Sequence, residues 1–214
     1  MIIDQLLYPV ETLGPGKRVA IWMVGCSRGC KGCSNPELWR PNGQIPVVPK
    51  DLFSTISRIA EENQVDGFTI TGGEPFDQPD DLLELVKLLR GLTADILVFS
   101  GYRHEELLLR PKAVAILQQI AVLIDGPYRE ELNVGLPLRG SSNQRILLFD
   151  KELKQRYESY ISTDEKRIQN FYFRDQIVSV GIHDVGFKRD LDSALKNMSV
   201  RRVDDEEGEM AHRD

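Results

Sequence analysis

Short apolar segments alternate with longer amphipathic segments along the first 150 residues. The apolar segments are rich in β-branched residues, which predicts strands at 17–24, 67–71, 95–100, 121–126 and 145–150. Spaced apolar residues between them predict helices at about 51–63, 80–91 and 111–120. This alternation is typical of βαβ units, so the expected fold class is α/β with a mostly parallel sheet.

Four unusual loops follow four of these expected strands. They are a cysteine-rich stretch after 17–24, TGGEP after 67–71, SGY after 95–100 and DGPY after 121–126. Chemistry in parallel sheets gathers at the carboxyl ends of the strands. We therefore expect the four loops to meet at one edge of the sheet. The stretch 36–49 contains four prolines, which exclude a long regular element there.

Beyond residue 150 the pattern changes. KELKQRYESYISTDEKR is highly charged and predicts a helix in its first part, NFYF and QIVSVGI predict a hairpin turned at Arg174–Asp175, and DLDSALKNM predicts a short helix. From 203 the chain is acidic and poor in apolar residues, which predicts disorder. The expected organisation is a core at 1–150, a C-terminal extension at 151–202 and a tail at 203–214.

Composition narrows the function classes. With 41% hydrophobic and 28% charged residues, the 214-residue chain has the balance of a globular protein. A net charge of −6 gives no basic groove for nucleic acid. The longest apolar runs fall short of the roughly 20 residues that cross a bilayer. Asp4 and the lack of a basic start argue against a secretory signal, and unpaired cysteines predict a reducing cytoplasm.

The chain's three cysteines, Cys26, Cys30 and Cys33, form a C-x3-C-x2-C run. Thiols confined to so short a segment make a poor disulfide framework and favour a metal site. Three thiolates leave one position open on a four-iron cluster, and interspersed glycines let the loop curl around a bulky group. A structural zinc site needs a fourth protein ligand, and none of the three histidines lies near the run.

The cysteine run followed about forty residues later by GGEP resembles the radical S-adenosylmethionine (SAM) superfamily. Within it the chain is most similar to the activating proteins of anaerobic ribonucleotide reductase, among the glycyl-radical-enzyme activases. The resemblance covers 1–150 and rests on the segments LGPGKRVAIWMVGC, CSRGCKGCSN, TGGEPFDQ, SGY, LIDGPY and LRGSSNQRI.

This resemblance implies a partial (βα) radical-SAM barrel with a mostly parallel curved sheet, to which this chain adds a small C-terminal α+β appendage. Cys26, Cys30 and Cys33 would ligate a [4Fe–4S] cluster whose open iron takes SAM. Reductive cleavage of SAM to a 5′-deoxyadenosyl radical would then generate a glycyl radical on a partner enzyme, an oxidoreductase activity. No catalytic residue beyond the ligands is expected. A flavodoxin- or ferredoxin-type protein would donate the electron, with no nucleic-acid or membrane partner.

The resemblance also assigns cofactor-binding positions. Gly72 and Gly73 would let the backbone approach the methionine part of SAM, with the Glu74 carboxylate nearby. Gly32 and Ser34 flank the last ligand, where the family's backbone meets adenine. These five positions carry the SAM assignment most directly.

For four further positions, two alternative roles remain open. Ser100 and Tyr102 would reach the ribose or the methionine carboxylate, or they only end a strand. Asp125 would bind SAM or a monovalent cation, or it belongs to an Asp-Gly turn. Asn143 would line the SAM pocket or a partner-docking face.

Two other functions stay open at this point. One is a radical SAM enzyme that modifies a peptide, a nucleoside or another small substrate. The extension 151–214 would then form a substrate lid, a docking element or a strand pair that completes the sheet. The other is an electron-transfer or zinc-binding module, which leaves GGEP unexplained.

Overall fold

The computed structural model describes residues 1–163, 168–173, 176–187, 189–191 and 193. Eight strands and five α-helices are assigned, together with three short 3-10 helices, η1 to η3. The strands are β1 (Ile3–Val10), β2 (Arg18–Met23), β3 (Gly67–Gly72), β4 (Ile96–Phe99), β5 (Val122–Asp125), β6 (Arg145–Leu148), β7 (Ile168–Tyr172) and β8 (Ile177–Gly181). The helices are α1 (Pro49–Glu62), α2 (Pro79–Leu89), α3 (His104–Leu108), α4 (Pro111–Leu117) and α5 (Lys154–Ile161).

The first six strands form one sheet in the order β1-β2-β3-β4-β5-β6. Strands β2 to β5 are parallel to one another, whereas β1 and β6 pair antiparallel at the two edges. The expected α/β class with a mostly parallel sheet is therefore confirmed. The antiparallel edge strand β1 was not expected, because the sequence placed the first strand at 17–24.

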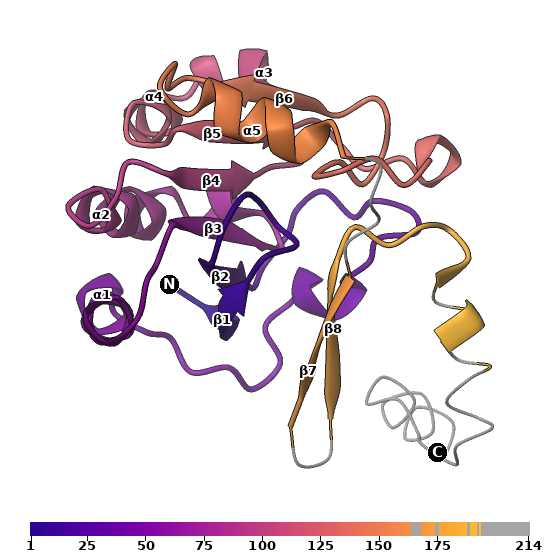
Figure 1. Ribbon diagram of the computed structural model, residues 1–214, viewed down its shortest axis with the longest axis horizontal. Coiled ribbons are helices and arrows are strands. Elements are labelled where there is room, and N and C mark those ends of the chain that lie inside the picture. The colour runs from indigo at the N-terminus through magenta and orange to yellow at the C-terminus, as the bar shows by residue number, and fades with distance from the viewer. Residues whose placement is uncertain (164–167, 174–175, 188, 192, 194–214) are drawn as a thin grey trace.

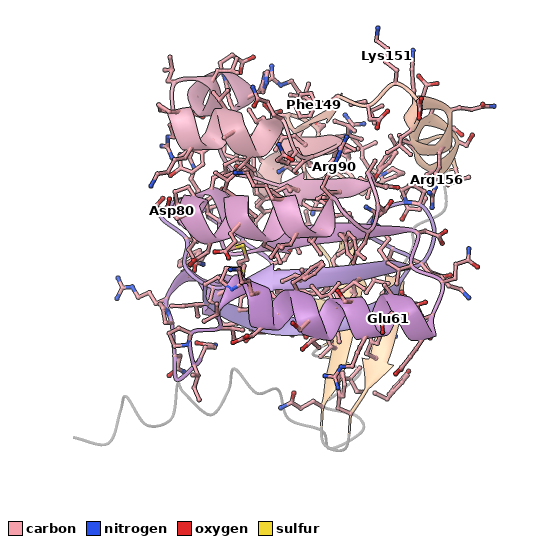
Figure 2. The ribbon with its side chains drawn as sticks, turned by 90° about the vertical axis from the view of Figure 1, so that its left-hand side faces the viewer. Glu61, Asp80, Arg90, Phe149, Lys151 and Arg156 are labelled. Carbon is pink, nitrogen blue, oxygen red and sulfur yellow. The ribbon has the colours of Figure 1, made fainter. Side chains whose placement is uncertain are left out.

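One face of the sheet is covered by helices. α1, α2 and α4 lie on the same side of the strands, on the left in Figure 1 and toward the viewer in Figure 2. Alternate residues of the strands point into the core beneath them, among them Ile21, Ile70 and Val98. Each of these three helices begins at a proline, whose fixed φ suits the first helical position.

The other face of the sheet is covered by residues that follow β6. Val180 of β8 is buried against Trp22 and Ala20 of β2, so the β7–β8 hairpin lies over the β1–β2 side. Tyr157 and Tyr160 of α5 are buried against β4 and β5. Residues beyond 150 thus complete the core of the sheet on this face.

A buried polar cluster fixes α5 to the start of the strands. The Arg18 side chain is fully buried and donates to the Thr69 hydroxyl at 2.7 Å and to Asp95 Oδ1 at 3.0 Å. The Tyr157 hydroxyl donates to the same Asp95 oxygen at 2.6 Å. Burial, together with the neighbouring Asp95 carboxylate, raises the pKa of Tyr157 well above its usual value. Asp95 Oδ1 accepts both of these bonds, whereas Asp95 Oδ2 has no hydrogen bond among the described residues and lies 3.6 Å from a guanidinium nitrogen of Arg156.

Most other expected elements match within a few residues. The proline-rich stretch 36–49 holds only η1 (Pro36–Trp39) before α1, and α3 is an addition that the sequence did not suggest. The hairpin is confirmed, while its turn residues, most of the short helix expected at 190–198 and the tail at 203–214 lie outside the described residues. Within the described residues, every helix is too short or too polar to cross a membrane.

Candidate metal centre

The three cysteines lie in the loop that follows β2, on the carboxyl edge of the parallel strands. The start of this loop is paired with η1, because Gly25 N–H donates to the Leu38 carbonyl at 2.8 Å and Cys26 N–H donates to the Trp39 carbonyl at 3.0 Å. The loop is therefore held along its first residues by backbone hydrogen bonds rather than left free.

The segment after β3 holds the other side of the cysteine loop. Gly73 N–H donates to the Met23 carbonyl at 2.7 Å, and Glu74 N–H donates to the Gly25 carbonyl at 2.8 Å. The Gln78 side chain donates to the Val24 carbonyl at 2.8 Å. GGEPFDQ is thus bonded to consecutive carbonyls at the start of the cysteine loop.

This contact explains why positions 72 and 73 are glycines, for a reason that the sequence did not suggest. A Cβ at Gly73 would lie 2.3 Å from the Gly25 carbonyl oxygen, and a Cβ at Gly72 would lie 2.3 Å from the Met23 carbonyl oxygen. Gly72 also has φ of 107°, a value that L-residues rarely adopt. Close approach of the cysteine loop therefore requires both glycines, with or without a ligand.

All three thiols are partly buried and face N–H donors. Amides of Arg28 and Gly29 point at the Cys26 sulfur, the Tyr128 amide points at Cys30 and the Asn35 amide at Cys33. Burial raises the pKa of each thiol, and these donors oppose the rise. The loop therefore supplies hydrogen bonds that favour thiolates, the form that binds metal.

The arrangement fits an iron–sulfur cluster better than a single ion. Among the described residues, no group of three His, Cys, Asp or Glu side chains converges closely enough to hold one metal ion. Ligands of a four-iron cluster bind different irons, so they need not converge on one point. The Trp39 indole N–H is buried without an acceptor in bonding distance, yet it faces Cys33 closely enough to lower that thiol's pKa. A donor of this kind suits a cluster sulfur.

The Glu74 carboxylate joins the ends of β3 and β4. It is 1% exposed and accepts from the Ser100 hydroxyl at 2.9 Å, the Gly101 amide at 2.7 Å and the Phe76 amide at 3.1 Å. Burial raises the pKa of Glu74 to about 7 despite these three donors. Glu74 and Ser100, both expected at the site, are therefore brought together and bonded to each other.

Tyr102 lies beside the cysteine loop with its hydroxyl paired. It donates to Asp77 Oδ1 at 2.8 Å and lies 3.1 Å from the Ser27 hydroxyl. The guanidinium carbons of Arg28 and Arg110 lie 4.5 and 4.0 Å from its ring centre, within cation–π range. In this structure the tyrosine contacts the protein's own loop.

Asp125, at the end of β5, has a cationic partner within the chain. It is 1% exposed and accepts from Arg145 Nε at 2.9 Å and from the His104 amide at 2.7 Å, and a second Arg145 nitrogen also contacts it. Arg145 donates to Glu105 as well, and the two carboxylates raise the pKa of its guanidinium. The Asp125 carboxylate, for which the sequence predicted SAM, a monovalent cation or a turn, is thus neutralised by a side chain of the protein itself.

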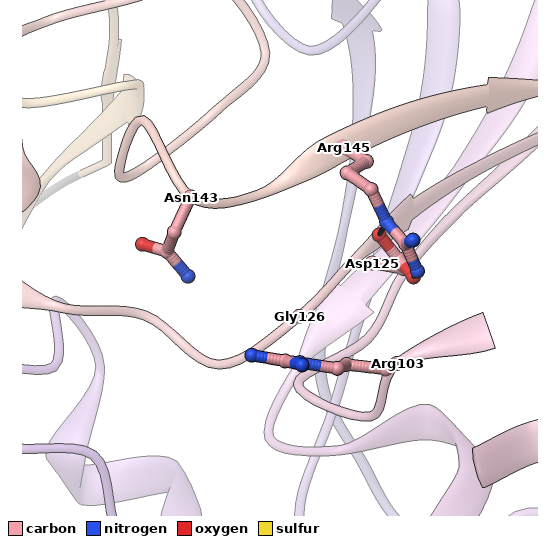
Figure 3. A pocket seen from close by; sticks show the side chains of 5 residues that line it. All are labelled: Arg103, Asp125, Gly126, Asn143 and Arg145. Carbon is pink, nitrogen blue, oxygen red and sulfur yellow. Dashed lines mark hydrogen bonds and ion pairs between the residues drawn. The ribbon is translucent and has the colours of Figure 1, made fainter. Parts of the chain in front are cut away.

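A cavity of about 240 Å³ opens beside this pair, lined by Arg103, Asp125, Gly126, Asn143 and Arg145 (Figure 3). The Asn143 amide nitrogen donates to the Pro127 carbonyl at 2.8 Å. Its side-chain oxygen is buried and has no partner among the described residues. Asn143 thus lines a cavity at the strand ends.

Gly32 and Ser34 lie in the last part of the cysteine loop. Gly32 has φ of 70°, and a Cβ there would lie 2.6 Å from the Glu130 carboxyl group of the β5–β6 loop. Ser34 is exposed. The Glu130 side chain therefore occupies the side of Gly32 on which a Cβ would lie, while the glycine itself stays exposed.

Three residues that build this site carried no predicted contact: Asp77, Gln78 and Arg145. The first two follow GGEP after Phe76, and polar side chains close to a motif are the only signal that could have found them. Arg145 gave no signal, because its partner Asp125 lies 20 residues away in the chain.

Comparisons with known proteins agree with this geometry. The family model described as 4Fe-4S single cluster domain matches residues 12–147. The chain is 34% identical over 149 residues to the "Anaerobic ribonucleoside-triphosphate reductase-activating protein" of Enterobacteria phage T4, covering 65% of this chain and 90% of the relative. The protein of the same name from Escherichia coli K12 is 32% identical over 148 residues, covering 65% and 94%. The chain belongs to the 4Fe-4S single cluster domain family and, within it, to the group of the anaerobic ribonucleoside-triphosphate reductase-activating proteins.

Proposed function

We propose that this chain is a radical SAM enzyme that generates a glycyl radical on an anaerobic ribonucleotide reductase. The observation that carries the proposal is the cysteine loop held by GGEPFDQ, in which three thiols face N–H donors. The names of the relatives support a reductase as the partner.

Cys26, Cys30 and Cys33 would hold the cluster. Bound there, a reduced [4Fe–4S] cluster supplies the electron that cleaves SAM to methionine and a 5′-deoxyadenosyl radical, which removes hydrogen from a glycine of the partner. The protein's own contribution is to fix the loop. Amides of Arg28, Gly29 and Tyr128 stabilise thiolate charge at two of the ligands.

Around the cysteines, we propose that SAM contacts the backbone at Gly32, Ser34, Gly72 and Gly73. The cavity beside Asp125 and Asn143 supports a polar ligand group there, since charged and amide side chains line it. A monovalent cation at Asp125 has less support, because Arg145 already neutralises that carboxylate.

Glu74, Ser100 and Tyr102 fit a supporting role in the same site. Their polar atoms bond one another, Asp77 or the cysteine loop, so they orient the strand ends on which SAM would rest. We propose that they shape the SAM site through this network.

The rest of the assignment follows from the same proposal. A partially closed barrel for 1–150, a cytoplasmic location and a flavodoxin- or ferredoxin-type donor are what the proposed activity implies, and we propose 151–202 as an extension added to that core. This extension favours a second candidate function, in which the chain is a radical SAM enzyme that acts on a small substrate. The relatives are matched over at least 90% of their length, which leaves them too little chain for a counterpart of this segment.

The test is anaerobic reconstitution with iron and sulfide, followed by SAM and dithionite, with 5′-deoxyadenosine measured by chromatography. The proposal predicts SAM-dependent formation of 5′-deoxyadenosine that is lost in Cys30→Ser. A reconstituted protein that holds iron but never forms 5′-deoxyadenosine would be an electron-transfer module instead. Modification of a peptide or nucleoside, with no radical on a reductase, would favour the small-substrate function.

A further inference from the structure

The part of the cysteine loop between the first two ligands is held by one side chain that lies outside the GGEP motif. Asp77 ends η2 (Pro75–Asp77), directly after that motif. Its Oδ2 accepts from the Ser27 amide at 2.8 Å, and its Oδ1 accepts from the Tyr102 hydroxyl at 2.8 Å. Both oxygens of one carboxylate are therefore engaged, one by the cysteine loop and one by the β4 edge.

Tyr102 adds a second contact to the same residue of the loop. Because its own proton goes to Asp77, its oxygen is free to accept from the Ser27 hydroxyl, 3.1 Å away. The Tyr102 side of this contact is rigid, since its amide donates to the Ser100 hydroxyl at 3.0 Å and Arg28 and Arg110 contact its ring. Ser27 itself is exposed, so packing alone does not fix it.

The position of Ser27 matters because of the two residues that follow it. The amides of Arg28 and Gly29 are the ones that point at the Cys26 sulfur. Contacts that fix both the Ser27 amide and the Ser27 hydroxyl restrict the backbone to which these next two amides belong. Hydrogen bonds to the sulfurs of an iron–sulfur site stabilise its more negative, reduced state and so raise its reduction potential.

We propose that Asp77 and Tyr102 form a positioning pair that holds Ser27 and thereby aims the Arg28 and Gly29 amides at Cys26. This inference deepens the proposed function, and its second half rests on that function. Neither residue touches the reacting atoms. They act through the cysteine loop: they keep its backbone ordered, and they thereby influence the reduction potential of the cluster that it would hold.

The variants follow from the hydrogen bonds. Asp77→Ala removes both acceptors, and Tyr102→Phe removes the hydroxyl but keeps the ring between the arginines. Asp77→Asn keeps both contacts, because its oxygen accepts from Ser27 while its amide donates to Tyr102. This variant should therefore behave like the parent protein. Matched controls are Tyr8→Phe, which loses a 2.7 Å bond to the Gln64 carbonyl, and Asp66→Ala, which frees the Lys17 amide.

The first measurement is amide hydrogen exchange of the apoprotein, followed at Ser27. Loss of a hydrogen bond to a charged acceptor should speed this exchange by about tenfold or more in Asp77→Ala. Tyr102→Phe should speed it less, and a double variant should be no faster than Asp77→Ala, because both changes act on one contact. The controls and Asp77→Asn should leave Ser27 exchange at the parent rate.

The second measurement is the midpoint potential of the reconstituted protein, with the thermal midpoint of each variant as reference. Asp77→Ala and Tyr102→Phe should shift the potential to more negative values, whereas the two controls should leave it unchanged even where they lower thermal stability. Unchanged Ser27 exchange in Asp77→Ala, or a potential that stays at the parent value once exchange has risen, overturns the proposal. A parent protein that holds no iron refutes the proposed function, while the exchange experiment still decides whether the pair holds Ser27.

Discussion

Glu74 makes the stability of the metal-free protein depend on pH in a defined direction. Its carboxyl is fully buried, and burial raises its pKa from 4.5 to about 7. The unfolded chain ionises this group near its ordinary value, so between pH 4.5 and 7 the unfolded state binds fewer protons than the folded one. The free energy of unfolding should therefore fall as pH rises through this window, and level off above it.

The size of this effect follows from the same pKa values. A difference of about 2.5 pKa units corresponds to roughly 3 kcal/mol of unfolding free energy lost between pH 4.5 and 8. Glu74→Gln cannot titrate, so it should lack this loss, whatever its stability at any one pH. The assay is urea unfolding of the apoprotein at pH 5 and pH 8, parent against variant.

Comparing the change in unfolding free energy between pH 5 and pH 8 in the two proteins separates the contribution of Glu74 from that of other groups. Burial lowers the pKa of His183, which affects the pH dependence with the opposite sign, and it raises the pKa of the cysteine thiols, which titrate above this window. Both contributions are common to parent and variant and cancel. A parent and a Glu74→Gln variant with the same difference in stability between pH 5 and pH 8 would refute the reasoning.

Three further changes have expected outcomes. Tyr157→Phe should lower the free energy of unfolding by roughly 1 kcal/mol, since it removes one hydrogen bond to Asp95, which still accepts from Arg18. An unchanged urea midpoint would mean that α5 is not held through this contact. Gly73→Ala should prevent stable iron incorporation, because its Cβ would lie 2.3 Å from the Gly25 carbonyl oxygen, and full iron content in this variant would contradict the packing argument. Anaerobically reconstituted parent protein should hold about four irons per chain, as one cubane cluster requires, and stoichiometric zinc without iron would contradict this.

The sequence predicted most of the parallel sheet because its strands are short, apolar and followed by distinctive loops. It missed β1, whose residues IDQLLYPV show no clean alternation and include a proline next to the last residue. The burial of α5 also escaped prediction. KQRYESYI is mostly polar, and the partner of its Tyr157 lies 62 residues earlier in the chain.

The site was predictable to the extent that its chemistry lies in contiguous motifs. The cysteine run and GGEP were recognised, but the reason for the two glycines was not, because the atoms that exclude a Cβ are the carbonyl oxygens of Met23 and Gly25, which lie elsewhere in the chain. Pairs such as Asp125–Arg145 and Asp77–Tyr102 depend on which strand ends become neighbours. Hydrophobic periodicity indicates that such neighbours exist, but not which side chains meet.

The most direct test of the proposed activity is electron paramagnetic resonance of a reductase activated by this protein. The reduced, reconstituted protein would be mixed anaerobically with SAM and the anaerobic ribonucleotide reductase of the same organism, with Cys30→Ser as the matched control. The proposed function predicts a glycyl doublet that requires SAM and is absent with Cys30→Ser. Formation of 5′-deoxyadenosine in the same mixture without any glycyl signal on the reductase would contradict it.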